Sequence, residues 1–556
     1  MAGFGELLHS IGEFGRFQKI TLFALCFPNV IVPLHFASVY FTQSDPERHC
    51  NTDWILRAHP NLTAEEQLNL TVPRGADGAL SRCRMFVPVD RDIGSIRRFG
   101  LNETEPCTDG WVYGSTLYVA TIVTDFDLVC DQAHLLQVAQ TVLMAGILVG
   151  CLLFGPFAES FGRKRATQVP VVLMFVFSGA SGLCPSFYLY LASQFLVGIG
   201  YGGYRLNAVI LGLLCLSLLL LTLTVTFTAT EWIGVSQRSW GSCVTQLCGA
   251  LGQCVLAGMI YFIRNWRVAQ LVTAALHGVI TIYIWCILES ARWLLGRGKT
   301  GEAKRLITKV AAINNCTIPE GLLEKIDENE KEKKEGAIAL IKSPVLRKNF
   351  FTISLAWFSL NLTYFSLSLN VANFGMSVFL TQLIFGLSEV PAHILSIWLL
   401  EVLGRRVSLV ATLLIGGLSV LAVLAVPQGY AVTVTTLVTA GRIFLNWAGS
   451  VCSVYLQELF PTSFRQTASG LGSIMSRIGG LMSPLVNLLG IYHPAIPTII
   501  FSSLSIISGS LCFLLPETRR KELPESILDA ESNGYTRQTN MDEPTGSKSS
   551  KMQTSC

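Results

Sequence analysis

The chain has 556 residues, and its composition excludes a set of ordinary soluble domains. Hydrophobic residues make up 51% of the chain and charged residues only 14%, whereas roughly 25% of the residues of a soluble protein are charged. The mean hydropathy is +0.49. A net charge of +4 spread over this length is too diffuse to indicate a nucleic-acid partner, so we expect none.

Apolar runs of membrane-spanning length follow one another along the chain. A helix needs about 20 apolar residues to cross a hydrocarbon core, so each run predicts one spanning helix, and membrane lipid as its surroundings. The first run has no small-residue cleavage site after it, so we expect it to be a helix rather than a signal peptide. The twelve runs are Ile20–Phe41, Leu135–Phe157, Ala166–Leu183, Phe187–Ala229, Trp240–Ile263, Val268–Leu288, Phe350–Asn370, Ser377–Leu400, Val407–Val426, Tyr430–Leu456, Thr467–Gly490 and Ile496–Leu515.

The segment 42–134 between the first two runs predicts an extracellular loop. It combines an even number of cysteines with three N-glycosylation sequons, and both disulfides and glycans are features of extracellular segments. The pairing of the cysteines stays open at this point. The candidate disulfide residues are Cys50, Cys83, Cys107 and Cys130, and the candidate glycosylation sites are Asn61, Asn69 and Asn102.

The remaining polar segments predict the cytoplasmic side. Segment 289–348 carries thirteen Lys and Arg, and basic loops near helix ends mark the cytoplasm. Its Gly298-Lys-Thr300 resembles a phosphate-binding loop, but Trp293 stands where that loop needs a glycine, so we expect no nucleotide site. The domain prediction is therefore a cytoplasmic terminus 1–19, helical bundles at 20–288 and 349–515, and a disordered cytoplasmic tail 516–556.

The two halves share local patterns that indicate an internal repeat. A carboxylate followed by Gly-Arg-Lys or Gly-Arg-Arg comes after the second and the eighth run. A glutamate seven residues before an arginine comes after the fourth and the tenth run, and a Glu-Ser or Glu-Thr pair closes each half. The last two patterns recur at offsets of 227 and 228 residues, but the first recurs at 242. Parallel repeats predict two facing bundles with a binding site between them near the middle of the bilayer.

The difference between the offsets of the repeated patterns shows where extra residues interrupt the repeat in the first half. Arg163 and Glu231 are 68 residues apart, whereas Arg405 and Glu458 are 53 apart. The excess of about fifteen residues falls in Leu211–Ala229, an apolar stretch with nine leucines and no charge. The fourth run is therefore too long for one spanning helix and short for two.

The repeated charges predict ion-pair latches that hold one face of the protein closed and exchange as the halves rock. The alternative is that the short basic loops only fix the orientation in the membrane. The candidate gating residues are Glu159, Arg163, Lys164, Glu231 and Arg238 in the first half, and Glu401, Arg405, Arg406, Glu458 and Arg465 in the second.

The motifs taken in order resemble the major facilitator superfamily, and within it the organic anion, cation and zwitterion transporter family of solute carriers. The resemblance covers nearly the whole chain up to the tail, and it is greatest to the organic-anion branch, of the urate and nicotinate type. It rests on the cysteine-bearing loop after the first helix and on Gly155…Glu159…Gly162-Arg-Lys, Asn265-Trp-Arg267, Glu289-Ser-Ala-Arg-Trp-Leu294, Glu458-Leu-Phe-Pro-Thr462, Arg465-Gln-Thr467 and Leu515-Pro-Glu-Thr518.

The chain departs from the family pattern at four places. The usual Asp-Arg of the first cytoplasmic loop is Glu159-Ser160, and the usual Pro before Glu289 is Leu288. An arginine commonly found in the fourth helix is Gln194. The apolar excess has no counterpart in the family.

Ionisable groups inside predicted spanning helices are candidate functional residues. Arg477 follows Arg465 by twelve residues, about 18 Å along a helix, which places it near the middle of the eleventh helix. Glu389 and His393 lie four residues apart, on one face of the eighth helix. Two alternatives are that Glu389 only neutralises Arg477 in a buried pair and that His393 only hydrogen-bonds within the bundle.

The resemblance adds roles to these residues. In the family the eighth and eleventh helices line the central cavity, anion carriers have arginine at the position of Arg477, and many have a basic residue at that of His393. Tyr364 and Phe365 match aromatic residues of the anion pocket, and Asn29 is a plausible polar contact. The predicted substrate-binding residues are thus Arg477, Tyr364, Phe365, His393, Glu389 and Asn29.

These observations predict an all-α membrane protein with the major facilitator fold, about twelve helices in two six-helix bundles. We expect a plasma-membrane transporter or exchanger of a small organic anion and a counter-solute, driven by gradients, with no catalytic residue, cofactor or metal. The alternatives are a carrier of organic cations or zwitterions, in which Glu389 is the key group, and a non-transporting protein disabled by the apolar excess.

Overall fold

The structure is a computed structural model, and it describes residues 28–519 except 33, 36–37, 39–40, 42–45, 76–77, 115–118, 209–237, 286–288, 290, 315, 317–342, 371–376, 428–429 and 461. Helical residues occur in each of the twelve predicted runs. Seven helices of the described part are long and apolar enough to cross a membrane. The apolar excess Leu211–Ala229, the predicted terminus 1–19 and most of the predicted tail lie outside the described residues.

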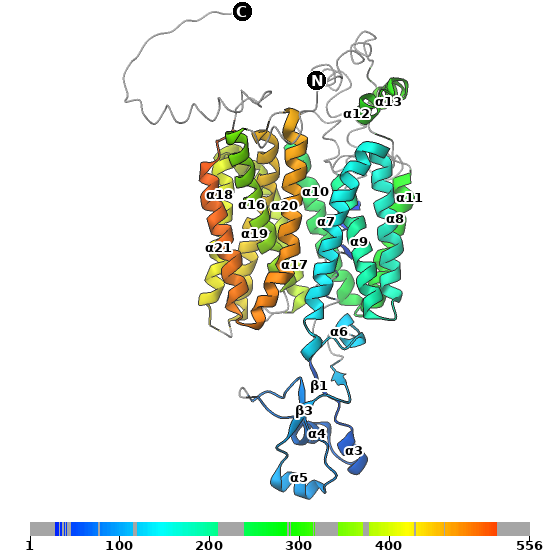
Figure 1. Ribbon diagram of the computed structural model, residues 1–556, viewed down its shortest axis with the longest axis vertical. Helices are drawn as coiled ribbons and strands as arrows, with labels where there is room; N and C mark the ends of the chain where they lie inside the picture. Colours follow the sequence, from blue (N-terminus) through cyan, green and yellow to red (C-terminus); the bar gives the residue numbers. More distant parts are fainter. Residues whose placement is uncertain are drawn as a thin grey trace, which may run out of the picture.

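Two groups of roughly parallel helices stand side by side (Figure 1). The first contains the described residues between 28 and 41, which carry no helix label, and the second begins at α16. The labelled helices of the first group are α7 (Leu135–Phe161), α8 (Arg163–Leu183), α9 (Phe187–Ala208), α10 (Arg238–Phe262) and α11 (Trp266–Trp285). Those of the second are α16 (Pro344–Leu369), α17 (Val378–Leu403), α18 (Arg405–Ala422), α19 (Ala431–Leu459), α20 (Thr462–Leu488) and α21 (Ala495–Leu511).

The helices pack mainly within their own group. α7, α8 and α9 contact one another and α8 contacts α11, while α16 packs against α20 and α18 against α19 and α21. The two groups meet where α7 packs on α20 and α10 packs on α17. These four helices therefore form the main contacts between the two groups.

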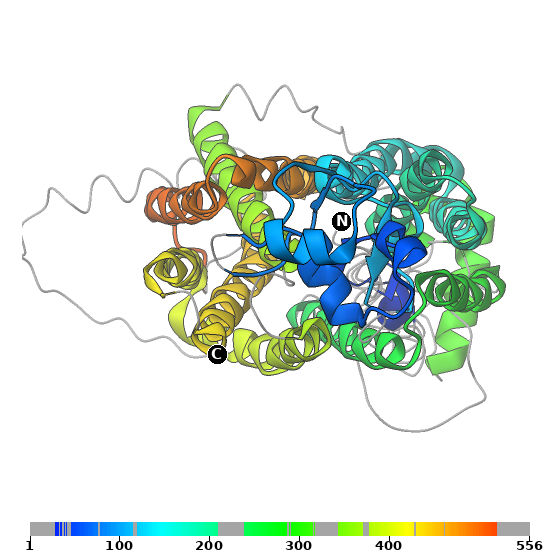
Figure 2. The ribbon, with the colours of Figure 1, turned by 90° about the horizontal axis from the view of Figure 1, so that it is seen from below.

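The segment between the first two runs folds outside the helical bundle. It contains four short strands, which the sequence analysis did not predict, paired antiparallel as β1 with β4 and β2 with β3. Figure 2 views the molecule from the side of this segment. Its elements are β1 (Arg48–Cys50), α3 (Trp54–Ala58), α4 (Ala64–Thr71), β2 (Arg84–Phe86), α5 (Ile93–Phe99), β3 (Thr104–Pro106), β4 (Trp111–Tyr113) and α6 (Ile122–Asp125).

Both pairs of candidate cysteines form disulfides in this segment. They are Cys50–Cys107 and Cys83–Cys130. Cys50 belongs to β1 and Cys83 directly precedes β2, so one disulfide lies at each strand pair. The three candidate glycosylation residues have exposed or half-exposed side chains, as an attached glycan requires; they are Asn61, Asn69 and Asn102. Thr63 of the first sequon caps α4, and its hydrogen bonds to Glu66 lower the pKa of that carboxyl.

The Asn-Trp-Arg motif ties this segment to the first bundle. The indole Nε1 of Trp266 and the Nε of Arg267 both donate to Oδ2 of Asp125, at 2.9 and 2.8 Å. Arg267 also donates to the backbone carbonyl of Cys184 at 2.9 Å, at the end of α8. The opposite end of the molecule carries α12 (Ala291–Gly296) and α13 (Thr300–Asn314) (Figure 1), which belong to the predicted cytoplasmic segment.

Candidate functional site

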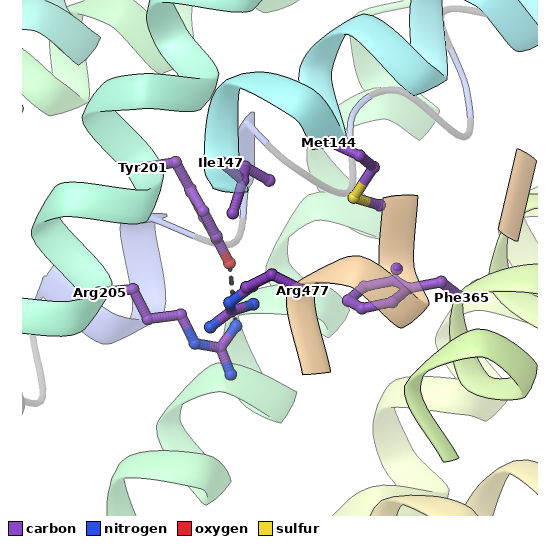
Figure 3. Close-up of a pocket in the computed structure, with 7 residues that line it drawn as sticks. Met144, Ile147, Tyr201, Arg205, Phe365 and Arg477 are labelled. Carbon is purple, nitrogen blue, oxygen red and sulfur yellow. Dashed lines mark hydrogen bonds between the residues drawn. The ribbon is translucent and has the colours of Figure 1, made fainter. Parts of the chain in front are cut away.

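A small cavity lies between the two groups of helices. Four helices supply its walls, two from each group. The lining residues are Met144 and Ile147 of α7, Tyr201 and Arg205 of α9, Phe365 of α16, and Arg477 and Gly480 of α20 (Figure 3). The cavity therefore sits at the predicted place, between the halves of the repeat.

Two guanidinium groups dominate the cavity. Figure 3 shows the side chains of Arg205 and Arg477 converging, one from each half of the protein. Nη1 of Arg205 donates to the hydroxyl of Tyr201 at 3.1 Å, and Nε of Arg477 is buried without a hydrogen-bond partner in the described part of the chain. Arg205 is an exposed residue of α9 and also lines this cavity.

The described carboxylates do not neutralise these two arginines, since none of the ion pairs among the described residues includes either one. The expected pair between Glu389 and Arg477 is wrong. Glu389 pairs instead with Arg442 of α19, whose Nη2 and Nε lie 2.9 and 3.2 Å from Oε1. Both side chains of that pair are buried, 7% and 2% exposed, and neither is among the residues that line the cavity.

Tyr364 belongs to the same buried pair rather than to the cavity wall. Its hydroxyl donates to Oε1 of Glu389 at 3.0 Å and lies 2.8 Å from Nη2 of Arg442. The guanidinium of Arg442 also stacks over two rings, 4.7 Å from the centroid of Tyr364 and 4.3 Å from that of Phe385. Cation–π contact and the carboxylate together compensate the positive charge of this arginine.

The predicted binding residues therefore separate into two groups. Phe365 and Arg477 line the cavity, whereas Tyr364, Glu389, His393 and Asn29 are not among its lining residues. His393 is buried and its Nε2 lies 3.2 Å from Nδ2 of Asn446, in keeping with the hydrogen-bonding alternative. Asn29 is helical and half-buried.

The sequence analysis missed Arg205 and Arg442. Each is a charged residue inside a predicted spanning run, and that alone marks a residue as a candidate. Applying the criterion to every run would have identified both, although it would not have shown which arginine has a carboxylate partner.

The gating prediction can be compared with the structure most fully in the second half. Nη2 and Nε of Arg405 contact Oε1 of Glu458 at 2.9 and 3.1 Å, so this latch is formed. Glu517 accepts hydrogen bonds from the backbone N–H groups of Arg405 and Arg406, at 2.9 and 3.1 Å. Thr518 donates to the other oxygen of Glu458 at 2.7 Å, which joins the two carboxylates into one network.

The first half repeats part of this arrangement. Glu289 accepts hydrogen bonds from the backbone N–H groups of Arg163 and Lys164, at 2.8 and 3.1 Å. The backbone carbonyl of Glu159 accepts from Trp293 and Arg297 of the predicted cytoplasmic segment, at 2.9 and 2.6 Å. Of the other gating candidates, Glu231 lies outside the described residues. The side chains of Arg238, Glu401 and Arg465 also lie outside the described part.

Known proteins match this chain over nearly its whole length. A family model described as "Sugar (and other) transporter" matches residues 105–211 and 224–526. The gap between the two matched parts falls in the apolar excess. Solute carrier family 22 member 13 from Homo sapiens is 39% identical over 540 residues, 97% of this chain and 95% of that protein. Organic anion transporter 3 from Oryctolagus cuniculus is 32% identical over 538 residues, 95% of this chain and 94% of that protein.

The fold also matches solved transporters. The proton:xylose symporter XylE bound to 6-bromo-6-deoxy-D-glucose matches with a TM-score of 0.55 and 17% identity, over 74% of this chain and 92% of that one. The inward-open conformation of the xylose transporter from E. coli matches with a TM-score of 0.53 and 16% identity, over 74% and 93%. These matches confirm the predicted fold and a multi-pass membrane protein. The chain belongs to solute carrier family 22 of the major facilitator superfamily, a family of transporters rather than enzymes.

Proposed function

We propose that this protein is a secondary active transporter or exchanger that moves small organic anions across the plasma membrane by alternating access. The observation that carries the proposal is the pair Arg205 and Arg477, which brings two cations into one cavity between the halves. The name of a relative, organic anion transporter 3, supports the same substrate class.

The chemistry of the cavity favours an anion. A guanidinium does not release its proton at physiological pH, and a charge at mid-membrane depth needs a partner of opposite sign. The carboxylates of the described residues supply none to these two arginines. A carboxylate substrate offers planar, bidentate hydrogen bonds to a guanidinium, while Phe365 and Met144 supply an apolar wall for a ring.

The cation or zwitterion alternative is disfavoured by the same geometry. It requires a free carboxylate in the cavity, and the candidate, Glu389, is already neutralised by Arg442. The hydroxyl of Tyr364 donates to the same carboxylate oxygen of Glu389, Oε1, that Arg442 contacts. A cationic substrate would therefore meet Arg205 and Arg477 with no compensating negative charge from the described residues.

Substitution of the cavity arginines tests the proposal. Arg477→Lys keeps the charge but loses the planar fork, and we expect initial uptake of an aromatic anion such as nicotinate or urate to fall on the order of tenfold. Arg477→Asp should abolish uptake while surface expression is retained. Arg205→Gln should also reduce uptake strongly. The measurement is uptake into expressing cells, normalised to surface-biotinylated protein.

Lys309→Asp is the matched control, since it makes the same charge change on an exposed position of α13, outside the cavity. It should leave uptake unchanged. Undiminished anion uptake by Arg477→Asp would rule out both the site and the anion assignment.

A further inference from the structure

Gln253 of α10 connects the first bundle to the buried ion pair of the second. Its Nε2 donates to Oε1 of Gln382 on α17 at 2.7 Å, and its Oε1 accepts from Nη2 of Arg442 on α19 at 3.2 Å. Gln253 and Gln382 are buried, 7% and 1% exposed. Both ends of one side-chain amide are therefore bound to the opposite bundle.

This contact lies in the extracellular half of the interface. Gln253 is nine residues before the end of α10, about 14 Å along the helix, and the next helix starts at Trp266, which is bound to Asp125 of the extracellular segment. Gln382 is four residues after the start of α17. A contact at this level resists separation of the bundles on the extracellular side.

Aromatic side chains close the same side of the interface. Phe41 of the first predicted run stacks on Phe379 of α17 with ring centroids 5.6 Å apart. Tyr261 of α10 meets the same ring edge-on at 5.9 Å, and Phe41 is only 1% exposed. The three rings are brought by both bundles, so opening toward the extracellular side requires them to part.

We propose that Gln253 is the positioning residue of the extracellular gate, and that its amide latches α10 to α17 and α19 when the gate is closed. The hydrogen bonds to Gln382 and Arg442 compensate for burying the amide in this state. When the gate opens, the same groups form hydrogen bonds with water. The amide therefore favours the closed state only by the difference in free energy between its hydrogen bonds to protein and those to water. This role rests on the alternating access proposed above, but not on the identity of the substrate.

Cys254, the next residue of α10, is a natural reporter of this gate. It is half-buried and packs at the bundle interface, because a Cβ built on Gly386 of α17 would lie 2.6 Å from its Sγ. Separation of α10 from α17 would expose this thiol to the extracellular solution. Its labelling rate by a membrane-impermeant methanethiosulfonate reagent therefore measures how often the gate is open.

Gln253→Leu tests the proposal, because it keeps a similar side-chain size and removes the amide. We expect Cys254 to be labelled on the order of tenfold faster, since two hydrogen bonds that favour closure are lost. Gln382→Leu removes one of the two and should give a smaller increase, about threefold. Labelling that remains in the Cys254→Ser background is subtracted.

Gln137→Leu is the matched control. Gln137 is a half-buried glutamine of α7 whose amide can bond within its own first turn, to the carbonyls of Ala133 and His134. It should leave the labelling rate unchanged. An unchanged rate in both Gln253→Leu and Gln382→Leu would overturn the latch, and so would an equal increase in Gln137→Leu. A protein that labels as expected but takes up no anion would overturn the proposed substrate and leave the gate standing.

Discussion

At the scale of single residues, the arginines inside the predicted membrane runs differ in how their charge is compensated. Arg442 has a carboxylate, a phenol and two aromatic rings around it. Arg477 and Arg205 share a cavity without such a carboxylate among the described residues. The sequence could identify all three as charges within membrane runs. It could not assign partners, because Glu389 and Arg442 lie on different helices and only packing decides which charge reaches which.

The buried pair itself makes a testable prediction. Glu389→Leu leaves Arg442 as an uncompensated buried charge, which typically costs roughly 3–5 kcal/mol of stability. We expect a clear fall in the thermal unfolding temperature of the purified protein. The double variant Glu389→Leu, Arg442→Met removes both charges, and we expect it to recover much of that loss.

The comparison of the two variants excludes a simple size effect, because both carry Leu at position 389. A double variant no more stable than the single one would mean that Arg442 is neutralised by another group and that the pair is not the main stabilising contact.

At the scale of elements, the two halves begin one helix in the same way. α8 and α18 each begin after a glycine with positive φ, Gly162 at 98° and Gly404 at 83°. In each case a carboxylate from the end of the same half, Glu289 or Glu517, accepts two backbone N–H groups of the first turn. Free N–H groups and the helix dipole make this end a favourable place for a carboxylate. The recurrence of these residues was visible in the sequence, but their joint function was not, since the partners are more than one hundred residues apart.

Gly162→Ala tests the importance of this cap. The positive φ disfavours any side chain with a Cβ, and a Cβ at this position would lie 2.4 Å from Oε2 of Glu289. We expect a loss of stability of about 2 kcal/mol or more, seen as a lower unfolding temperature. Gly258→Ala in α10 is the control, because a Cβ added there would meet no atom within 4 Å and its φ is not positive. That change should be neutral or slightly stabilising; equal losses in both variants would argue against a specific cap.

The short elements of the predicted extracellular segment show where sequence patterns do not identify secondary structure. Each of the four strands has three residues, too few for an alternating pattern to be recognised. What orders them is the pairing of Cys50 with Cys107 and of Cys83 with Cys130, and connectivity cannot be deduced from cysteine positions alone. The membrane helices, in contrast, were predictable because each is a long apolar run.

At the scale of the whole molecule, the two halves differ in sequence length around the fourth helix. α9 ends at Ala208, and residues 209–237 lie outside the described part. In the second half Arg405 reaches Glu458. Its repeat counterpart Arg163 is buried, only 8% exposed, and its Nε has no hydrogen-bond partner among the described residues. By the repeat, the predicted partner of Arg163 is Glu231, which follows the apolar excess and lies outside the described part.

We therefore expect that deleting fifteen residues, 211–225, improves surface expression and anion uptake. The deletion makes the spacing from Arg163 to Glu231 equal to that from Arg405 to Glu458, so the fourth helix can run without interruption into the first-half latch. Surface biotinylation and uptake report the outcome, and removal of fifteen residues from the tail after position 534 serves as a control for chain length. A deletion variant that is less well expressed and less active than the parent would show that the stretch is functional.

A double-mutant cycle identifies the mechanism within the deletion variant. Arg163→Gln and Glu231→Gln are made singly and together, and thermal unfolding of the purified proteins is measured. If the latch forms, the double variant should lose less stability than the sum of the two singles, by about 0.5 kcal/mol or more, as expected for residues in contact. The same cycle in the full-length parent should show no coupling. Coupling of equal size in both backgrounds would mean that the latch already exists and that the apolar excess leaves the amino-terminal bundle intact.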